Sequence, residues 1–469
     1  MRRLLLAIAL LTLPTLLDAQ DHPAGDWTGT IEAGALRLRL VVHLTGTDGA
    51  WTGTMDSPDQ GVDGLPLAEV QADGRGLTFT VPSIQGRYEG SWTDGGRRVQ
   101  GTWSQGAASL PLTLERATGP VAREPRPQEP VGALPYEVSD VSFAGGAADV
   151  TLAGTLTLPP GSGPFPAVVL ISGSGPQDRD ETLLGHKPFL VLADHFTRAG
   201  IAVLRYDDRG VAGSTGTFAA ATSEDFTEDA AAAVRFLAAR PEIDPARIGL
   251  VGHSEGGLVA PLVETRHGGV AFLVLMAGPG LPGHEILELQ TGLILEANGA
   301  SAEQVAAAVA RTRELDRMIL EAGDDRGLET RLVARIEAMA QAMGRRERAA
   351  QGLTPEAIRA QARELAGPWF RFFLAYDPVP TLRAVDVPVL AVNGAKDLQV
   401  PSRANLDAIA EALLAGGNAD VTTRVLPGLN HLFQTAGTGS PAEYTQIEET
   451  VAPAALELMT GWILERFGG

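Results

Sequence analysis

Residues 248–265 carry the pattern that most constrains how this chain can fold. A short apolar run at 248–251 leads into residues 252–256, Gly-His-Ser-Glu-Gly, and a run of helix-forming residues follows at once. This Gly-x-Ser-x-Gly pattern predicts a sharp turn between a buried strand and a helix, with Ser254 at a strained backbone position on the turn. The two glycines have no Cβ atoms, so the strand and the helix can pack closely on either side of the serine.

The sequence around this turn alternates between strand-like and helix-like segments. We expect strands at residues 138–143, 150–158, 166–171, 201–206, 247–251, 272–276, 387–394 and 422–426, and helices near 187–199, 224–239 and 255–265. The first two strands have the pattern of an antiparallel pair. Alternation of this kind predicts an α/β fold with a doubly wound, mostly parallel sheet.

The alternation stops between about residues 280 and 380, where the sequence has helical periodicity. Residues 301–310 begin with Ser-x-x-Gln, which fits a helix capping box. We therefore expect a helical insertion between two strands of the sheet, lying as a cap above Ser254. Its last segment, residues 368–376, holds five aromatic residues. We expect three of these side chains to bind substrate, with packing in a core as an equally weighted alternative: Trp369, Phe370 and Phe373.

Residues 25–117 have a different character and predict a small all-β domain. Large apolar and polar residues alternate at 35–43, 77–81 and 87–92, and turn-forming residues separate these runs. This spacing is typical of an antiparallel barrel or sandwich. Four of the six Trp lie in this domain, and we favour their packing in its core over their lining a ligand cleft. Residues 118–135 contain five Pro among charged residues and predict a semi-rigid linker to a catalytic domain at 136–469.

The first 19 residues have the pattern of a secretory signal peptide. Two Arg precede an apolar run at 4–17, which is too short to span a membrane comfortably. We therefore predict a periplasmic or secreted protein. The chain has no Cys, which excludes disulfides and thiolate metal sites. A formal net charge of −20 disfavours nucleic acid and anionic membrane surfaces as partners.

A serine hydroxyl needs a general base, and the base needs a carboxylate to orient it. Asp397 lies just beyond the expected strand at 387–394, and His431 lies just beyond the next strand. The carboxyl ends of parallel strands are where open α/β sheets place their sites. We therefore predict a catalytic triad of Ser254, Asp397 and His431, with Asp386 and Asp377 as rivals for the acid.

Hydrolysis through a tetrahedral intermediate also needs hydrogen-bond donors for the oxyanion. We expect one donor to be the backbone N–H of Glu255, directly after the nucleophile. The second donor should come from the turn after the strand at 166–171, where we favour Ser174 over Gly175. The same turn could cradle a phosphate, but Asp178 stands where the dinucleotide fingerprint needs its third glycine. We therefore expect no cofactor. We also expect no metal.

The remaining charged motifs and histidines have mainly structural interpretations. Residues 178–180, Asp-Arg-Asp, and 207–209, Asp-Asp-Arg, follow strands on the side of the predicted site. We expect them to anchor one another by ion pairs, although Arg209 could instead contact a substrate carboxylate. His253 is interpreted as a packing or hydrogen-bonding neighbour of the nucleophile. His186 and His195 are placed on a predicted helix with structural roles.

Five motifs from residue 136 onward resemble those of a known family. They lie at residues 170–180, 206–210, 252–257, 393–397 and 430–431. In these motifs the chain resembles bacterial α/β-hydrolase esterases related to dienelactone hydrolases and to the serine aminopeptidase and prolyl oligopeptidase groups. The resemblance implies the α/β-hydrolase fold, the same triad, and hydrolysis of short-chain esters. The chain departs from many of these relatives at residues 172–173, where Ser-Gly replaces His-Gly.

We therefore expect a serine hydrolase that acts on short-chain acyl esters through an acyl-enzyme. One alternative is a serine exopeptidase or aminopeptidase for small peptides, because ester and amide hydrolysis use the same triad. In that case Glu255, or an acid in the cap, would bind the ammonium group of the substrate. An alternative of another class is a surface- or polymer-binding protein that acts through the all-β domain. In each catalytic case the partner is a small-molecule ester or a short peptide.

Overall fold

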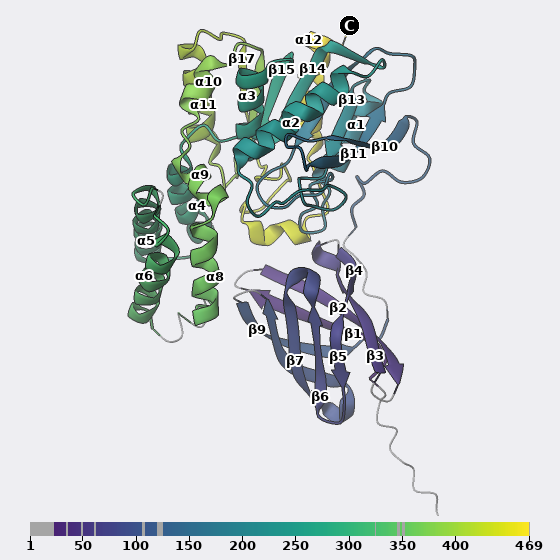
Figure 1. Cartoon of the computed structure of the whole chain (residues 1–469), viewed down its shortest axis with the longest axis vertical. Helices are drawn as coiled ribbons and strands as arrows, with labels where there is room; N and C mark the ends of the chain where they lie inside the picture. Colours follow the sequence, from purple (N-terminus) through teal and green to yellow (C-terminus); the bar gives the residue numbers. More distant parts are fainter. Residues whose placement is uncertain are drawn as a thin grey trace, which may run out of the picture.

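The computed structural model describes residues 23–33, 36–47, 50–60, 62–105, 108–119, 125–323, 325–344, 348 and 352–468. The signal peptide predicted at residues 1–19 lies outside the described residues, as does the part of the linker at 120–124. The described residues form two sheets with separate cores, together with a group of helices (Figure 1).

The first sheet has nine antiparallel strands in the order β4-β3-β2-β1-β9-β8-β7-β6-β5. Strands β4 and β5, at its two ends, are separated only by Leu67, whose N–H donates to the carbonyl of Gly53 in β3 at 3.0 Å. The sheet therefore closes on itself as a barrel (Figure 1). Its strands are β1 (Gly25–Ala33), β2 (Leu36–Thr47), β3 (Ala50–Ser57), β4 (Val62–Pro66), β5 (Ala68–Ala72), β6 (Gly76–Val81), β7 (Gly86–Thr93), β8 (Arg98–Gln105) and β9 (Ala108–Arg116).

Aromatic side chains fill the barrel. Trp27 and Trp103 are buried in its core, and the ring of Trp92 lies 5.4 Å from that of Trp27. The hydroxyl of buried Tyr88 donates to the carbonyl of Val99 at 2.9 Å, so this polar group is satisfied inside the core. These tryptophans pack in or against the core.

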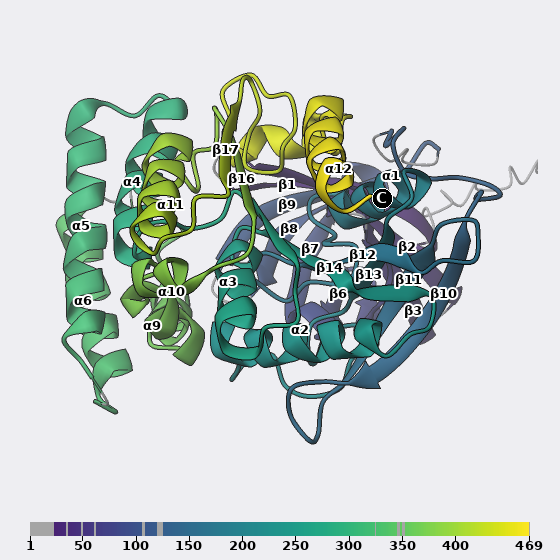
Figure 2. The same ribbon diagram turned by 90° about the horizontal axis from the view of Figure 1, so that it is seen from above.

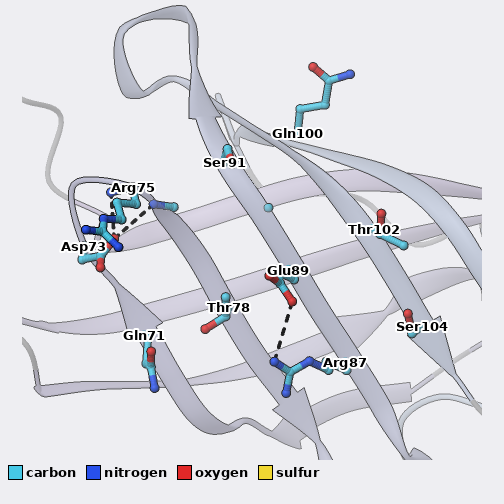
Figure 3. A pocket seen from close by; sticks show the side chains of 12 residues that line it. Gln71, Asp73, Arg75, Thr78, Arg87, Glu89, Ser91, Gln100, Thr102 and Ser104 are labelled. Atoms are coloured by element: carbon cyan, nitrogen blue, oxygen red, sulfur yellow. Dashed lines mark hydrogen bonds and ion pairs between the residues drawn. The ribbon is translucent and has the colours of Figure 1, made fainter.

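The outer face of β6, β7 and β8 bears an open hollow of about 580 Å³ (Figure 3). Polar side chains such as Gln71, Thr78 and Thr102 line it, and Arg87 pairs with Glu89 at 3.7 Å. Exposed polar side chains on alternate strand positions are what a solvent-facing sheet presents. The side chains that line this hollow do not form a triad of serine, base and acid, and Ser254 is not among them.

The second sheet has eight strands in the order β10-β11-β13-β12-β14-β15-β16-β17. Strand β11 is antiparallel to both β10 and β13, and the remaining pairs are parallel. The strands are β10 (Glu137–Ala144), β11 (Thr151–Leu158), β12 (Phe165–Ile171), β13 (Ala202–Tyr206), β14 (Ile243–His253), β15 (Phe272–Met276), β16 (Val389–Gly394) and β17 (Val421–Leu426). This arrangement confirms the predicted fold class.

Helices cover both faces of this sheet (Figure 2). Helices α2 (Ser223–Ala238), α3 (Gly256–His267) and α11 (Ser402–Ala415) pack on one face, next to α10 (Val379–Ala384). Helices α1 (Pro188–Arg198) and α12 (Pro453–Phe467) pack on the other. The central strands are buried on both faces, which explains why their sequences are continuous apolar runs.

The helical insertion lies between β15 and β16. It contains α4 (Gly283–Ala297), α5 (Ala302–Leu320), α6 (Leu328–Ala342), α8 (Pro355–Leu365) and α9 (Pro368–Ala375). Its own core includes Leu332, Ile336 and Leu374. At the start of α5 the predicted capping box is present, because Ser301 Oγ accepts the Gln304 N–H at 3.3 Å and Gln304 Oε1 accepts the Ser301 N–H at 2.8 Å.

The second half of the linker docks on the α/β domain instead of spanning open space. The Arg126 guanidinium donates to the carbonyls of Gly185, Ile447 and Thr445 at 3.1, 2.9 and 3.1 Å. Gln128 accepts the Thr450 N–H at 2.6 Å and donates to the Val451 carbonyl at 2.6 Å. The linker therefore supports the segment that follows β17, which also carries His431.

Candidate active site

Ser254 occupies the sharp turn between β14 and α3. It has a φ of +52°, in the left-handed region that residues other than glycine rarely adopt. Its N–H donates to the Met276 carbonyl of the neighbouring strand at 2.8 Å. A Cβ atom on Gly252 would lie 2.0 Å from the Gly256 carbonyl oxygen, and one on Gly256 would lie 2.1 Å from the Ile171 oxygen. Both glycines are therefore required by the turn, as the sequence pattern predicts.

The structure brings Asp397 and His431 together at the carboxyl ends of β16 and β17. Asp397 Oδ2 lies 2.8 Å from His431 Nδ1, and both side chains are buried. The other carboxylate oxygen of Asp397 accepts the N–H groups of Gln399 and Val400 at 2.8 and 2.9 Å. These bonds fix the carboxylate, and the carboxylate in turn orients the imidazole so that Nε2 remains for a proton transfer.

The two rival acids have other contacts. Asp377 Oδ1 accepts the Val379 N–H at 3.0 Å at the start of α10. Asp386 lies beside Glu264, where burial and the Asp386 charge raise the pKa of Glu264 to about 7. Of the three candidates it is Asp397 that contacts His431.

Ser254 makes no hydrogen bond to His431 in the part of the chain that the structure describes, but the residue before it contacts His431. The ring of His253, the residue before the nucleophile, has its centroid 4.9 Å from that of His431. Contacts between nucleophile and base are often long in unliganded sites and tighten when substrate binds. The triad of Ser254, Asp397 and His431 therefore stays a prediction, of which the structure shows the Asp397–His431 contact.

Two backbone N–H groups beside Ser254 are suited to an oxyanion. A Cβ on Gly173 would lie 3.3 Å from Ser254 Cβ, so the loop after β12 passes directly beside the nucleophile. The Gly173 N–H itself is occupied, because it donates to Glu181 Oε1 at 2.7 Å. Among the described residues, the N–H groups of Ser174 and Glu255 make no hydrogen bond. Gly175, the second choice for the loop donor, has a φ of +97°, a conformation that residues with a Cβ rarely adopt.

The Glu255 side chain is already engaged by other residues and is not a free anionic group. It is buried, and its Oε1 accepts the Ser223 hydroxyl at 2.5 Å and the Trp369 indole N–H at 2.8 Å. Burial raises the pKa of this carboxyl. The contact with Trp369 ties helix α9 of the insertion to the residue next to the nucleophile.

The three aromatic residues predicted to bind substrate divide into two groups. Trp369 and Phe373 stack at 5.4 Å with an interplanar angle of 3°, on the side of α9 that reaches Glu255. Phe370 packs against the core of the helical insertion. All three are half-buried. Trp369 is thus the one that contacts the residue next to the nucleophile, and Phe373 stacks on it.

The acidic turns after β12 and β13 anchor one another. Arg179 pairs with Asp207 at 2.7 Å, and Arg205 of β13 pairs with Asp180. Arg209 instead pairs with Asp229 of helix α2 at 2.6 Å. Arg209 is almost fully buried, so its guanidinium is engaged within the domain and does not face a substrate carboxylate.

Asp208 is a further buried acid beside the site. It accepts the Ser172 hydroxyl at 3.0 Å and the Gln177 N–H at 2.9 Å, and burial raises its pKa to about 8. A small, partly open cavity of about 10 Å³, close to the volume that one water molecule needs, lies between Asp208, Tyr206 and Glu255. Ser172, where the chain departs from its relatives, thus serves to hold Asp208.

One histidine lies elsewhere than the sequence predicted, and one acid was missed. His186 precedes α1 and is not helical; its Nε2 donates to the Tyr444 carbonyl at 2.8 Å and its Nδ1 accepts the Thr450 hydroxyl at 3.0 Å. Leu183 and His186 instead form a short antiparallel bridge, which ends the turn before the helix can begin. Glu181 was not singled out, although it directly follows the Asp-Arg-Asp motif. It contacts His253 at 2.8 Å.

Two further findings concern the described residues. They contain no group of three or more His, Cys, Asp or Glu arranged to hold a metal ion. None of their helices has the length and apolar character that a membrane span requires.

Two comparisons relate the sequence to known proteins. A family model described as X-Pro dipeptidyl-peptidase (S15 family) matches residues 146–412, which is more than half of the chain. The chain is also 36% identical over 155 residues to esterase EstD of Thermotoga maritima. That alignment covers 33% of this chain and 35% of EstD, so the chain spans about a third of the length of this relative.

Solved structures that match the chain include an esterase and a puromycin hydrolase. Esterase Pf2001 of Pyrococcus furiosus has a TM-score of 0.43 and 17% identity, covering 71% of this chain and 92% of the esterase. The puromycin hydrolase has a TM-score of 0.41 and 18% identity, covering 92% of this chain and 52% of that one. Similarity at this level supports no statement about activity. The family match, by contrast, runs through the strands and turns that hold Ser254 and Asp397, and it establishes that the chain belongs to the X-Pro dipeptidyl-peptidase (S15) family.

Proposed function

We propose that this protein hydrolyses short-chain carboxylic esters, with Ser254 as nucleophile, His431 as general base and acid, and Asp397 as the group that orients His431. The observation that carries the proposal is the buried Asp397–His431 pair, 2.8 Å apart, beside a serine on a strained turn. The name of EstD, which shares 36% identity over the aligned residues, supports an ester as substrate.

In the proposed mechanism His431 Nε2 takes the proton of the Ser254 hydroxyl as its oxygen attacks the ester carbonyl. The N–H groups of Glu255 and Ser174 stabilise the oxyanion of the tetrahedral intermediate. His431 then returns the proton to the leaving alcohol, and an acyl-enzyme remains on Ser254. A water molecule deprotonated by His431 attacks the acyl group and releases the carboxylic acid.

The geometry around Glu255 favours esters over aminoacyl substrates. An aminopeptidase needs a carboxylate available to the substrate ammonium group, and Glu255 is buried against Ser223 and Trp369. The second candidate is nevertheless a peptidase, because the matching family is described as X-Pro dipeptidyl-peptidase. In that case an acid other than Glu255 would have to bind the ammonium group.

The test compares wild type with Ser254→Ala on two substrate classes, p-nitrophenyl butyrate and Xaa-Pro-p-nitroanilides. We expect kcat for the ester to fall by at least about 10⁴-fold in S254A, because the nucleophile is lost. Ser91→Ala on the barrel surface is the matched control and should keep full turnover. Ester turnover retained in S254A would refute the triad, and faster turnover of the anilides than of the esters would favour the peptidase.

Export remains part of the proposal. It comes from the signal-peptide pattern in residues 1–19. Sequencing the N-terminus of protein recovered from the periplasm or medium tests it, with cleavage after Ala19 as the expected result.

A further inference from the structure

Three segments of the site meet at one buried carboxylate–imidazole pair. Glu181 Oε1 accepts the Gly173 N–H at 2.7 Å, in the loop that passes beside Ser254. The same oxygen lies 2.8 Å from Nδ1 of His253, at the end of β14. Nε2 of His253 lies 3.1 Å from the carbonyl oxygen of His431. The pair therefore joins the oxyanion loop, the nucleophile strand and the segment of the catalytic histidine.

The number of protons on this pair follows from its partners. A carbonyl oxygen only accepts hydrogen bonds. His253 Nε2 must therefore carry the hydrogen that it donates to the carbonyl oxygen of His431. Nδ1 then either donates to an ionised Glu181 or accepts from a protonated one. In both cases the pair holds one proton more than a neutral imidazole beside a free carboxylate. Loss of that proton breaks one of the two bonds that His253 makes.

The surroundings make this proton important for the position of the pair. Glu181 and His253 are 3% and 5% exposed, so water does not replace a lost contact. The second oxygen of Glu181 is buried and makes no hydrogen bond to any described residue. Glu181 also has a φ of +52°, a conformation that its tertiary contacts must maintain.

We propose that Glu181 and His253 are positioning residues for the hydrolysis proposed above: while they share a proton, they hold the Gly173–Ser174 loop and the His431 backbone in register with Ser254. This inference rests on the proposed function of the triad. It assigns the pair no contact with substrate, and its effect is on kcat through geometry. Release of the proton at alkaline pH frees one anchored segment and lowers the rate.

The ionisable groups around His253 give the direction of the pH effect. Glu181, His431 and Asp397 face it, and Asp208 lies near Glu181. Burial lowers the pKa of His253, but the charge and hydrogen bond of Glu181 outweigh burial, and the pKa is raised. His253 thus keeps its proton above its ordinary value of 6.5 and loses it on the alkaline side.

The test measures pH–rate profiles for p-nitrophenyl butyrate in wild type, Glu181→Gln and His253→Phe. E181Q keeps the shape of the side chain but removes the charge, so we expect the alkaline limb of kcat to move down by roughly one pH unit. H253F keeps a ring and removes both bonds, and we expect kcat to fall about 100-fold with KM within about threefold. The matched control is His267→Gln, at the other end of α3, which removes an exposed His–Glu pair of 3.0 Å.

The outcomes separate this inference from the proposed function. If wild type and H267Q turn over the ester, S254A does not, and E181Q keeps the wild-type alkaline limb, the positioning role is wrong while the triad stands. If H253F unfolds, E181Q still decides, because its pH profile is read on folded protein checked by near-UV circular dichroism. A wild type without ester turnover refutes the proposed function itself. A shifted limb in E181Q with unchanged KM supports the inference.

Discussion

The barrel and the α/β domain differ most in what they bury. In the barrel the core consists of apolar and aromatic side chains such as Trp27, Phe79 and Tyr88. The α/β domain has equally apolar cores on both faces of its sheet, but it also buries many ionisable side chains. They gather around the carboxyl ends of the strands and include Glu181, Arg205, Asp207, Asp208, Arg209, Asp229, His253, Glu255, Asp397 and His431.

Buried charges cost free energy unless they are paired and hydrogen-bonded. Some of those around Ser254 are paired, as in Arg179–Asp207, Arg209–Asp229 and Asp397–His431. Asp208 and Glu255 instead accept hydrogen bonds from neutral donors, and burial raises the pKa of both. The barrel buries far fewer ionisable groups: among its described residues Asp59 is buried and accepts from Arg39 Nε at 2.9 Å, while apolar side chains fill the interior. The contrast shows that the α/β domain buries ionisable side chains, at a cost in free energy, where they hold loops in position beside the proposed catalytic residues.

The largest expected effect tests whether buried pairs stabilise the α/β domain as this comparison requires. Arg209→Met leaves Asp229 buried without its partner, and we expect the free energy of unfolding of this domain to fall by about 3–5 kcal/mol. On the barrel surface Arg98 pairs with Glu115 at 2.8 Å, with both side chains about half exposed. Arg98→Met should change stability by less than about 1 kcal/mol.

Chemical denaturation, followed by hydrogen exchange resolved to peptides, assigns each loss to its domain. Equal losses in the two variants would contradict the distinction between the regions.

The next prediction concerns the change in stability with pH, which has opposite signs in the two regions. Burial lowers the pKa of His186 in the α/β domain from 6.5 to about 4. The unfolded chain therefore binds a proton that the folded domain excludes, and stability present above pH 6.5 is lost as the pH falls towards 4. The full loss is about 3 kcal/mol.

In the barrel, burial lowers the pKa of His43, but Asp56 and Asp26 outweigh it and raise the pKa. That contribution is present below pH 6.5 and is lost as the pH rises through the raised value. Hydrogen exchange at pH 7 and pH 5 measures both regions in one sample. His186→Gln should flatten the acid response of the α/β domain, and an unchanged response would exclude His186 as its source.

The smallest expected effect concerns the contact between the helical insertion and the α/β domain. Trp369→Phe keeps an aromatic ring but removes the 2.8 Å hydrogen bond to Glu255. We expect kcat/KM for p-nitrophenyl esters to fall about fivefold, close to 1 kcal/mol, because α9 is no longer tied beside the nucleophile. Phe370→Leu, in the core of the insertion, serves as the comparison. It should lower stability more than kcat/KM, and the reverse order would show that Phe370 and not Trp369 faces the substrate.

Much of the fold was predictable from the sequence, and so was the turn at Ser254. Strands β12, β13, β15 and β16 are apolar runs because both of their faces are covered, and each lies within a few residues of its predicted range. Strand β17 lies at the edge of the sheet and is only partly buried, but it too matches its predicted range. A Cβ on Gly252 would lie 2.0 Å from the Gly256 carbonyl oxygen, four residues along the chain, and a requirement of this kind leaves a local pattern. A Cβ on Gly256 would instead lie 2.1 Å from the Ile171 oxygen, in a strand distant in sequence, so the reason for that glycine is seen only in the fold.

The contacts that were missed join distant parts of the chain. Glu181 reaches His253 across 72 positions, and Arg126 reaches Ile447 across 321. Neither residue stands out by type, since Glu and Arg are usually exposed. His186 was placed on a helix because helix-forming residues follow it, but its bonds to Tyr444 and Thr450 hold it in a turn.

By itself the sequence determined the order of the strands and helices, the all-β character of residues 25–116 and the strained serine turn. These follow from periodicity and steric limits within a few residues. Only the tertiary structure decided that Asp397 and not Asp377 or Asp386 faces His431, and that Glu255 is engaged by Trp369. The physical reason is that hydrogen bonds and ion pairs depend on distances of about 3 Å between side chains. Packing of the whole chain sets those distances, and no local pattern records them.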